Sequence, residues 1–307
     1  MKIGLMFAGQ GAQTIGMGRD IYETFPEAFR LFQKADEFLK YPLSQVMFNG
    51  PAEELTQTAI CQPALYVHGL ALLSALKSTL PGFEFSAAAG LSLGEFTAHT
   101  AAGTFDFETG LRLVSQRATF MQQACEESTG GMAAIIGAEE TVVRDLAAAT
   151  DVDVANLNCP GQIVISGEAS KVALAASLAK DYGARKAVEL KVAGAFHSRL
   201  MEPAYKRLQQ ELEATSLSSP SVPVICNVDA LPVSDPETIR RTLAEQVTNS
   251  VRWMESIQYL VNQLHCDILL ELSPGDVLAG LANRICKGTR VLSISNKATL
   301  EKVIKSL

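Results

Sequence analysis

The stretch Gly90-Leu-Ser-Leu-Gly94 places one serine between two glycines, a spacing that suits a sharp turn with an exposed hydroxyl. The run EFSAAAG before it predicts a buried strand, and the residues after Ser92 are compatible with a helix. Strand, tight turn and helix form the setting in which a G-x-S-x-G motif presents a nucleophile. Ser92 is therefore a candidate nucleophile, although a serine that only caps the next helix fits the same residues.

A serine hydroxyl needs a neighbouring general base, most often histidine, and the chain contains four histidines. His68 lies in an apolar helical stretch, which indicates a packed side chain, and His99 lies two helical turns beyond Ser92. His197 follows the last strand of a predicted inserted domain, and domain junctions favour clefts. We therefore rank His197 first as the base and His265, at the start of a strand, second.

The helix predicted by FETGLRLVSQRATFMQQA contains two arginines in different settings. Arg112 has polar residues three and four positions away, which predicts a side chain that faces water. Arg117 has only apolar residues at these offsets: Leu113, Val114, Phe120 and Met121. A buried guanidinium must meet an anion. This anion is either an internal carboxylate, for which Glu95 is a candidate, or a substrate carboxylate held in a bidentate clamp.

Composition limits the classes of function that remain. The 307 residues, 48% hydrophobic and 19% charged, are enough for a large core, and the net charge of −7 argues against a general nucleic-acid binder. We find no apolar run of membrane-spanning length and no signal-peptide pattern. The six cysteines are scattered without C-x-x-C spacing, so we expect no zinc site, redox motif or disulfide framework, and a reduced, cytoplasmic location.

The predicted elements between residues 131 and 192 follow the order β-α-β-β-α-β, which is typical of a ferredoxin-like domain. Strands and helices also alternate outside this segment, with strands at KIGLMF, EFSAAAG, SVPVICNV, CDILLELS and RVLSIS. This alternation indicates a mostly parallel sheet. We predict an α/β fold in which residues 1–128 and 194–307 form the large domain and residues 129–193 an inserted small domain.

Seven motifs occur in order along the chain: FAGQGAQ, CQPAL, GLSLGEF, QRATFMQQA, NLNCPGQIVISG, AFHSRLMEPA and EQVTNSVRW. Each is weak alone, but the ordered set resembles the malonyl-coenzyme A:acyl carrier protein transacylases of bacterial-type fatty acid biosynthesis. The resemblance covers residues 3 to about 285. It implies an α/β-hydrolase-like large domain with an inserted ferredoxin-like small domain, in agreement with the predicted order of elements.

The resemblance also implies roles for the reacting groups. Ser92 would accept the acyl group, and His197 would be its base. A carbonyl at the position of Gln246 would orient the histidine, which fits the absence of an obvious acidic third member. The backbone N–H groups of Gln10 and Leu93 would form the oxyanion hole.

The substrate-binding roles follow in the same way. Arg117 would bind the malonyl carboxylate, and the ring of Phe196 would leave little room for an α-methyl branch. Gln62 and Asn158 match family positions near the active site. The chain departs from the family at Leu91, where many members have histidine, and at two positions of the first motif, Ala8 and Ala12.

The implied reaction is a ping-pong transfer in which Ser92 attacks malonyl-coenzyme A and the phosphopantetheine thiol of acyl carrier protein then attacks the malonyl ester. Coenzyme A is part of a substrate, and we expect no cofactor, metal, nucleic acid or membrane partner. Three alternatives stay open: a serine hydrolase, a discrete acyltransferase of a polyketide synthase, and a protein that binds acyl groups without turnover.

Carrier proteins of this type are acidic, so docking on this acidic chain needs a local basic patch. Six basic residues cluster in the sequence around the last strand of the insert and the His197 segment: Arg185, Lys186, Lys191, Arg199, Lys206 and Arg207. For at least half of them, a solvated surface charge is the simpler interpretation.

Overall fold

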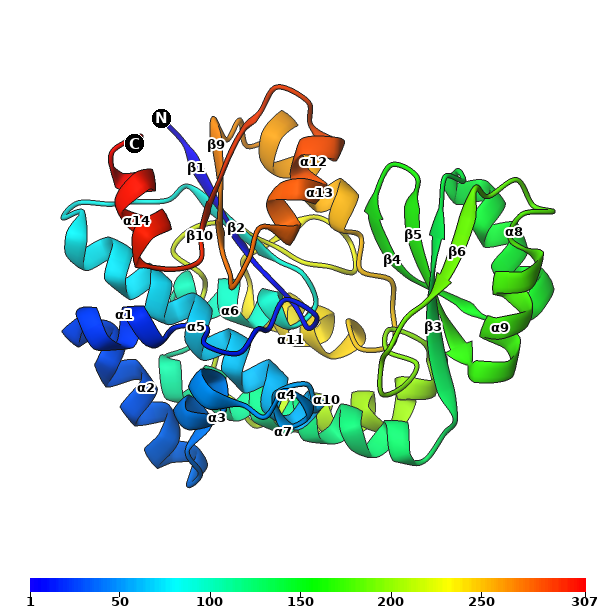
Figure 1. Ribbon diagram of the computed structural model, residues 1–307, viewed down its shortest axis with the longest axis horizontal. Coiled ribbons are helices and arrows are strands. Elements are labelled where there is room, and N and C mark those ends of the chain that lie inside the picture. The colour runs from blue at the N-terminus through cyan, green and yellow to red at the C-terminus, as the bar shows by residue number, and fades with distance from the viewer.

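The computed structural model describes all 307 residues and contains two sheets (Figure 1). The larger sheet has the strand order β10-β9-β1-β2-β7-β8. Its strands are β1 (Ile3–Phe7), β2 (Ala87–Gly90), β7 (Val224–Ile225), β8 (Pro232–Val233), β9 (Ile268–Leu272) and β10 (Arg290–Ile294). All neighbouring pairs are parallel except β7 with β8, so the predicted mostly parallel sheet is confirmed.

Helices cover both faces of this sheet, because its strands are apolar on both sides. Along β1, Leu5 and Phe7 join the main core, whereas Met6 between them joins a second core under α12 and α13. The helices of this part of the chain are α1 (Arg19–Thr24), α2 (Pro26–Leu39), α3 (Leu43–Asn49), α4 (Ala52–Leu55), α5 (Thr58–Thr79), α6 (Leu93–Ala101), α7 (Phe107–Glu126), α10 (Glu202–Glu213), α11 (Pro236–Glu245), α12 (Trp253–Asn262), α13 (Val277–Ile285) and α14 (Lys297–Ile304), with a short 3₁₀ helix at Arg199–Met201.

The smaller sheet is antiparallel and has the order β4-β5-β3-β6. Its elements follow one another in the chain as β3 (Gly130–Ile136), α8 (Glu140–Thr150), β4 (Asp153–Cys159), β5 (Gln162–Glu168), α9 (Ala169–Leu178) and β6 (Lys186–Glu189). Both helices lie on one face of this sheet, on the right in Figure 1. The predicted β-α-β-β-α-β order is therefore confirmed.

Strand β6 is shorter than the predicted strand ARKAVELKV. It lies at the edge of the sheet and pairs only with β3, so nothing on its other side holds the residues that follow. After a last hydrogen bond from the Leu190 N–H to the Met132 carbonyl at 2.9 Å, the chain leaves the sheet, and Leu190, Lys191 and Val192 line a cavity.

Helix α5 is the one helix that is long and apolar enough to cross a membrane by length and composition, with a mean hydropathy of 1.5. The expectation that the chain has no such run is therefore wrong. However, 83% of this apolar window is buried inside the protein, where α5 packs against α2, α6 and α7. This burial identifies α5 as the central helix of the main core.

Candidate active site

Ser92 lies between the end of β2 and the start of α6, with φ 55° and ψ −112°. A positive φ is strained for a residue with a side chain, and such strain is often found at reacting groups. The flanking glycines permit this turn. A Cβ atom on Gly90 would lie 1.9 Å from the carbonyl carbon of Gly94, and one on Gly94 would lie 2.1 Å from the carbonyl oxygen of Phe7. The helix can therefore begin directly against the sheet only because both residues are glycine.

His197 lies in hydrogen-bond contact with Ser92. The Ser92 Oγ is 2.8 Å from His197 Nε2, and His197 Nδ1 is 2.8 Å from the backbone oxygen of Gln246. Because a carbonyl only accepts, Nδ1 carries the proton and Nε2 is free to accept from the serine hydroxyl. Burial, assisted by the charge of Arg117, lowers the pKa of His197 to about 4, so the ring is neutral at pH 7. This arrangement can take up a proton from Ser92.

The other histidines lie elsewhere. His68 and His99 are fully buried, and His99 Nδ1 is paired with the hydroxyl of Thr104. His265, ranked second as a base, is exposed and forms no contact with Ser92, so that alternative is wrong.

Arg117 is 1% exposed, which confirms the burial predicted from its apolar helix face. Its Nη2 donates to Ser92 Oγ at 2.9 Å and to Gln246 Oε1 at 2.8 Å, and its Nη1 donates to Gln62 Oε1 at 2.6 Å. The Nε group has no partner. Of the two alternatives for Arg117, the internal ion pair with Glu95 is not formed, because every acceptor around the guanidinium is neutral. Burial lowers the pKa of Arg117 to about 9, and Glu95 opposes this effect from a distance.

A buried polar network behind the serine escaped the sequence analysis. The side chain of Asn227, just after β7, accepts from the Ser92 N–H at 2.7 Å and donates to the Gly90 carbonyl at 2.7 Å. Glu95 Oε2 accepts from the Asn227 N–H at 3.0 Å and from Gln246 Nε2 at 2.5 Å. The only available signal for Asn227 was a polar residue at the carboxyl end of a predicted strand, the edge where ligands bind in parallel sheets.

Two backbone N–H groups beside the serine are free to bind an anion. Leu93 is the first residue of α6, and Gln10 lies in the loop after β1; neither N–H donates to a protein acceptor. This loop presses against the elbow, since a Cβ atom on Gly9 would lie 2.5 Å from the carbonyl oxygen of Leu91. Free N–H groups at a helix N-terminus favour negative charge, so these two can stabilise an oxyanion.

A cavity of about 350 Å³ opens over Ser92 and His197. Its lining comes from both parts of the chain: Gln10, Gln62, Leu93 and Phe196 from the part that holds the larger sheet, and Asn156, Asn158 and Lys191 from β4 and the segment after β6. Asn158 Oδ1 is buried without a partner and is available as an acceptor. Arg117 and Gln246 do not line the cavity but lie behind Ser92.

Comparison with known proteins identifies the family. The acyl transferase domain model matches residues 5–303. The malonyl CoA-acyl carrier protein transacylase of Bacillus subtilis is 41% identical over all of this chain and 97% of its own length. A polyketide biosynthesis malonyl CoA-acyl carrier protein transacylase of the same organism, PksC, is also 41% identical, over 94% of this chain and 98% of its own length.

The chain belongs to the malonyl CoA-acyl carrier protein transacylase family.

Solved structures agree with this assignment and with the predicted fold class. The acyl-carrier-protein S-malonyltransferase of Bartonella henselae superposes with a TM-score of 0.95 and 38% identity, covering 100% of this chain and 99% of that protein. A second match, with a TM-score of 0.94 and 35% identity over the full length of both chains, is a malonyl-transacylase in complex with a type II polyketide synthase acyl-carrier protein.

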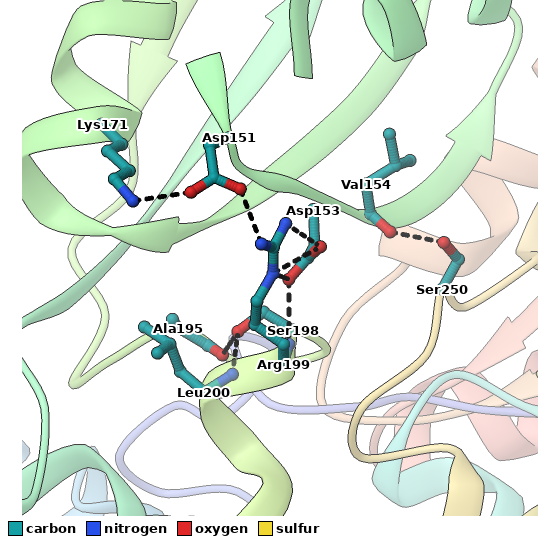
Figure 2. Close-up of polar contacts among 9 residues, drawn as sticks. All are labelled: Asp151, Asp153, Val154, Lys171, Ala195, Ser198, Arg199, Leu200 and Ser250. Atoms are coloured by element: carbon teal, nitrogen blue, oxygen red, sulfur yellow. Dashed lines mark hydrogen bonds and ion pairs between the residues drawn. The ribbon is translucent and has the colours of Figure 1, made fainter. Parts of the chain in front are cut away.

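In this member of the transacylase family, the segment that carries His197 is tied to the smaller sheet by Arg199 (Figure 2). The Arg199 guanidinium binds both carboxylate oxygens of Asp153 and reaches Asp151 at 2.6 Å. Its backbone N–H also donates to Asp153 at 2.9 Å, and Lys171 holds the other oxygen of Asp151 at 2.7 Å. The carboxylates thus fix the backbone two residues after His197.

The segment that follows Gln246 is tied to the same strand. Ser250 donates a hydrogen bond to the Val154 carbonyl, as Figure 2 shows. Val251 N–H donates to the Ala155 carbonyl at 2.8 Å, and Leu157 N–H donates to the Val251 carbonyl at 2.9 Å. Strand β4 therefore contacts both segments that set the orientation of the histidine ring.

The six basic residues of the predicted patch fall into two groups. Three form ion pairs with carboxylates: Arg199, Lys206 and Arg207. The other three form no ion pair: Arg185, Lys186 and Lys191.

Arg112, predicted to face water, is half-buried and pairs with Glu211 of α10, so that expectation is wrong.

Proposed function

We propose that the protein transfers a malonyl group from malonyl-coenzyme A to the phosphopantetheine thiol of an acyl carrier protein, through an ester of Ser92, in fatty acid biosynthesis. One observation carries the proposal. The buried Arg117 guanidinium, which no carboxylate contacts, donates to the same hydroxyl oxygen that His197 contacts. A serine paired with a base can accept an acyl group, and a guanidinium beside it favours an acyl group that carries its own carboxylate.

The first half-reaction uses the neutral imidazole. Nε2 of His197 takes the proton of Ser92 as Oγ attacks the thioester carbonyl carbon. The N–H groups of Gln10 and Leu93 stabilise the oxyanion, and one such donor is worth about 3 kcal/mol of barrier. The intermediate then collapses, the carbon–sulfur bond breaks, and the imidazolium returns the proton to the departing coenzyme A thiolate.

The second half-reaction runs in the opposite direction. The carrier thiol gives its proton to His197 and attacks the ester carbon, and Ser92 leaves and recovers the proton. The Gln246 carbonyl keeps the Nδ1 proton in place throughout and favours the imidazolium that forms twice per cycle. No acidic third residue is needed.

The remaining residues orient the acyl chain. Arg117 holds the malonyl carboxylate, with Gln62 fixing the guanidinium from its other side. Phe196 narrows the space beside the reacting carbon, and the unpartnered Asn158 oxygen offers an acceptor to the pantetheine arm. We assign the large domain to residues 1–128 and 194–307 and the small domain to residues 129–193, with the cavity between them. We place the reaction in the cytoplasm.

A discrete acyltransferase of a polyketide synthase is the second candidate, because the polyketide relative PksC is as similar to this chain as the transacylase of Bacillus subtilis. Both candidates share the chemistry and differ in the carrier that receives the malonyl group. Rates of transfer to a fatty acid carrier and to a polyketide carrier distinguish them.

The central test is covalent loading of Ser92. Malonyl-coenzyme A should add one malonyl group to the wild-type protein by intact mass, and Ser92→Ala should show no adduct. Addition of a phosphopantetheinylated carrier should remove the adduct and malonylate the carrier. An adduct that persists in Ser92→Ala would reject the nucleophile, and rapid release of free malonate without a carrier would favour a hydrolase.

A further inference from the structure

Glu95 is a fully buried carboxylate that no step of the proposed mechanism uses. It lies on α6, three residues after Ser92, and is 0% exposed. Its Oε2 accepts two hydrogen bonds, but its Oε1 has no partner and no cation is in contact with it. Burying a carboxylate in this way is unfavourable. A glutamine could accept the same two hydrogen bonds without being able to ionise, so the presence of an ionisable side chain calls for an explanation.

Gln246 connects Glu95 to Arg117. Its Nε2 donates to Glu95 Oε2 at 2.5 Å and to the Ser92 carbonyl at 3.0 Å, while its Oε1 accepts from Arg117 at 2.8 Å. An amide has its donors on one branch and its acceptor on the other. By holding the donor branch, Glu95 determines that the acceptor branch faces the guanidinium.

Two charged groups from neighbouring elements affect the pKa of Glu95: Arg117 from α7 and Asp229 from the loop after β7. Glu95 in turn contributes to the raised pKa of the Cys226 thiol, just after β7. Burial raises the pKa of Glu95 to about 8. The hydrogen bonds from Gln246 and Asn227 and the charge of Arg117 oppose this rise, and Asp229 adds to it. Arg117 is thus the single positive charge among them, and it lies one amide group away.

We propose that Glu95 is a positioning residue for Arg117 that is a neutral carboxyl when Arg117 binds the malonyl carboxylate, so that an ionised Glu95 competes with the substrate for this one positive charge. The inference rests on the proposed malonyl transfer. Where Glu95 is ionised in the empty site, a malonyl group on Arg117 brings a second anion to one guanidinium, and Glu95 then takes up one proton from solvent. An acetyl group brings no charge and causes no proton uptake.

The test compares single-turnover loading of Ser92 by malonyl- and acetyl-coenzyme A between pH 6.5 and 8.5, followed by intact mass. The ratio of the two kcat/KM values cancels the titration of His197 and of the coenzyme, which both reactions share. In the wild type, the preference for malonyl should fall by about fourfold from pH 6.5 to 8.5, as Glu95 ionises in the empty site. In Glu95→Gln, the preference should fall only slightly over this range, as Arg117 with its pKa of about 9 begins to lose its proton, and it should be higher than in the wild type at pH 8.5.

Asp229→Asn provides the matched control. It removes a nearby negative charge that forms no hydrogen bond with Gln246 and instead pairs with Arg241 at 3.2 Å. Because Asp229 raises the pKa of Glu95, this variant should keep the pH dependence but shift it to lower pH.

A Glu95→Gln protein that keeps the wild-type pH dependence overturns the inference. So does one in which malonyl and acetyl loading fall by the same factor, since that would indicate a purely structural role. If Glu95→Gln does not fold, the uptake of protons by the wild-type protein is measured in weak buffer at pH 8. Malonyl loading should then consume more protons than acetyl loading, and equal uptake rejects the inference. Malonyl loading with a pH-independent preference rejects only this inference, whereas no malonyl loading at any pH rejects the proposed function as well.

Discussion

At the scale of single residues, the expected selectivity for the acyl group depends on a buried guanidinium that no carboxylate contacts. Arg117 is one of the largest fully buried side chains, yet it meets only the neutral acceptors of Ser92, Gln62 and Gln246. A bound carboxylate would add a charge-assisted pair that a neutral acyl group cannot form. We therefore expect a preference for malonyl to come from this incompletely paired guanidinium, in addition to any fit of shape.

Arg117→Ala should lower kcat/KM for malonyl transfer by at least about a hundredfold, because removal of one partner of a buried charge pair costs about 3 kcal/mol or more. Acetyl transfer should fall less, so that the preference for malonyl shrinks. Arg112→Ala on the same helix removes a half-buried arginine that pairs with α10 instead of the site, and should leave the preference unchanged. Equal losses for both substrates in Arg117→Ala would return this residue to a structural role.

At the scale of elements, the elbow between β2 and α6 depends on a close approach of backbone to backbone. The carbonyl oxygen of Phe7 on β1 occupies the place where a side chain on Gly94 would begin. The start of α6, with the Leu93 N–H, is held there in turn by Asn227 through the Ser92 N–H. The position of the Leu93 N–H, a proposed oxyanion donor, therefore depends on residue 94 having no Cβ atom.

Gly94→Ala should destabilise the fold by about 3 kcal/mol or more, because the new Cβ would meet backbone that cannot move aside as a side chain would. Gly280→Ala is the matched control, since its Cβ at an exposed position of α13 would meet nothing within 4 Å. That change should be neutral or stabilise by up to about 1 kcal/mol through helix propensity. Urea unfolding of both variants measures the difference, and a Gly94→Ala protein as stable as Gly280→Ala would contradict the packing argument.

Local patterns predicted the elbow and the burial of Arg117, because glycine spacing and helix periodicity are properties of a few neighbouring residues. The order of strands and helices was predictable for the same reason. The network of Glu95, Asn227 and Gln246 was not, since it joins side chains more than a hundred residues apart in the chain. The sequence analysis named Glu95 as one candidate partner of Arg117, but in the structure the side-chain amide of Gln246 lies between them.

At the scale of the whole molecule, the cavity depends on how the two sheets are joined. Strand β4 of the smaller sheet holds the backbone after His197 through Asp153 and Arg199, and pairs with the backbone after Gln246 through Val251. The same strand carries Asn158 to the cavity. A substrate that contacts β4 can therefore affect the orientation of the His197 ring, through the hydrogen bonds that join this strand to the segments after His197 and Gln246.

The pH dependence of stability is also a property of the whole molecule. Burial lowers the pKa of His68 and His197 to about 4 and that of His99 to about 3. Each stabilises the fold as a neutral ring above its unfolded pKa of about 6.5, and this stability is lost as the pH falls toward the folded pKa. Glu95 has the opposite effect: its raised pKa favours the fold at low pH and disfavours it as the pH rises toward 8. Stability should therefore be greatest near about pH 6.5.

His68 allows the contribution of one histidine to be measured alone, because it is fully buried and does not line the cavity over Ser92. Below pH 6 the unfolded chain binds a proton at this residue and the folded protein does not, which costs about 1.4 kcal/mol of stability per pH unit. His68→Leu removes this proton, so its free energy of unfolding should fall less steeply between pH 6 and 4.5 by that amount. Urea unfolding at three pH values in this range measures the slope, and malonyl loading of Ser92 at pH 7 confirms that the variant is folded. A slope equal to that of the wild type would mean that the folded protein already binds a proton at His68.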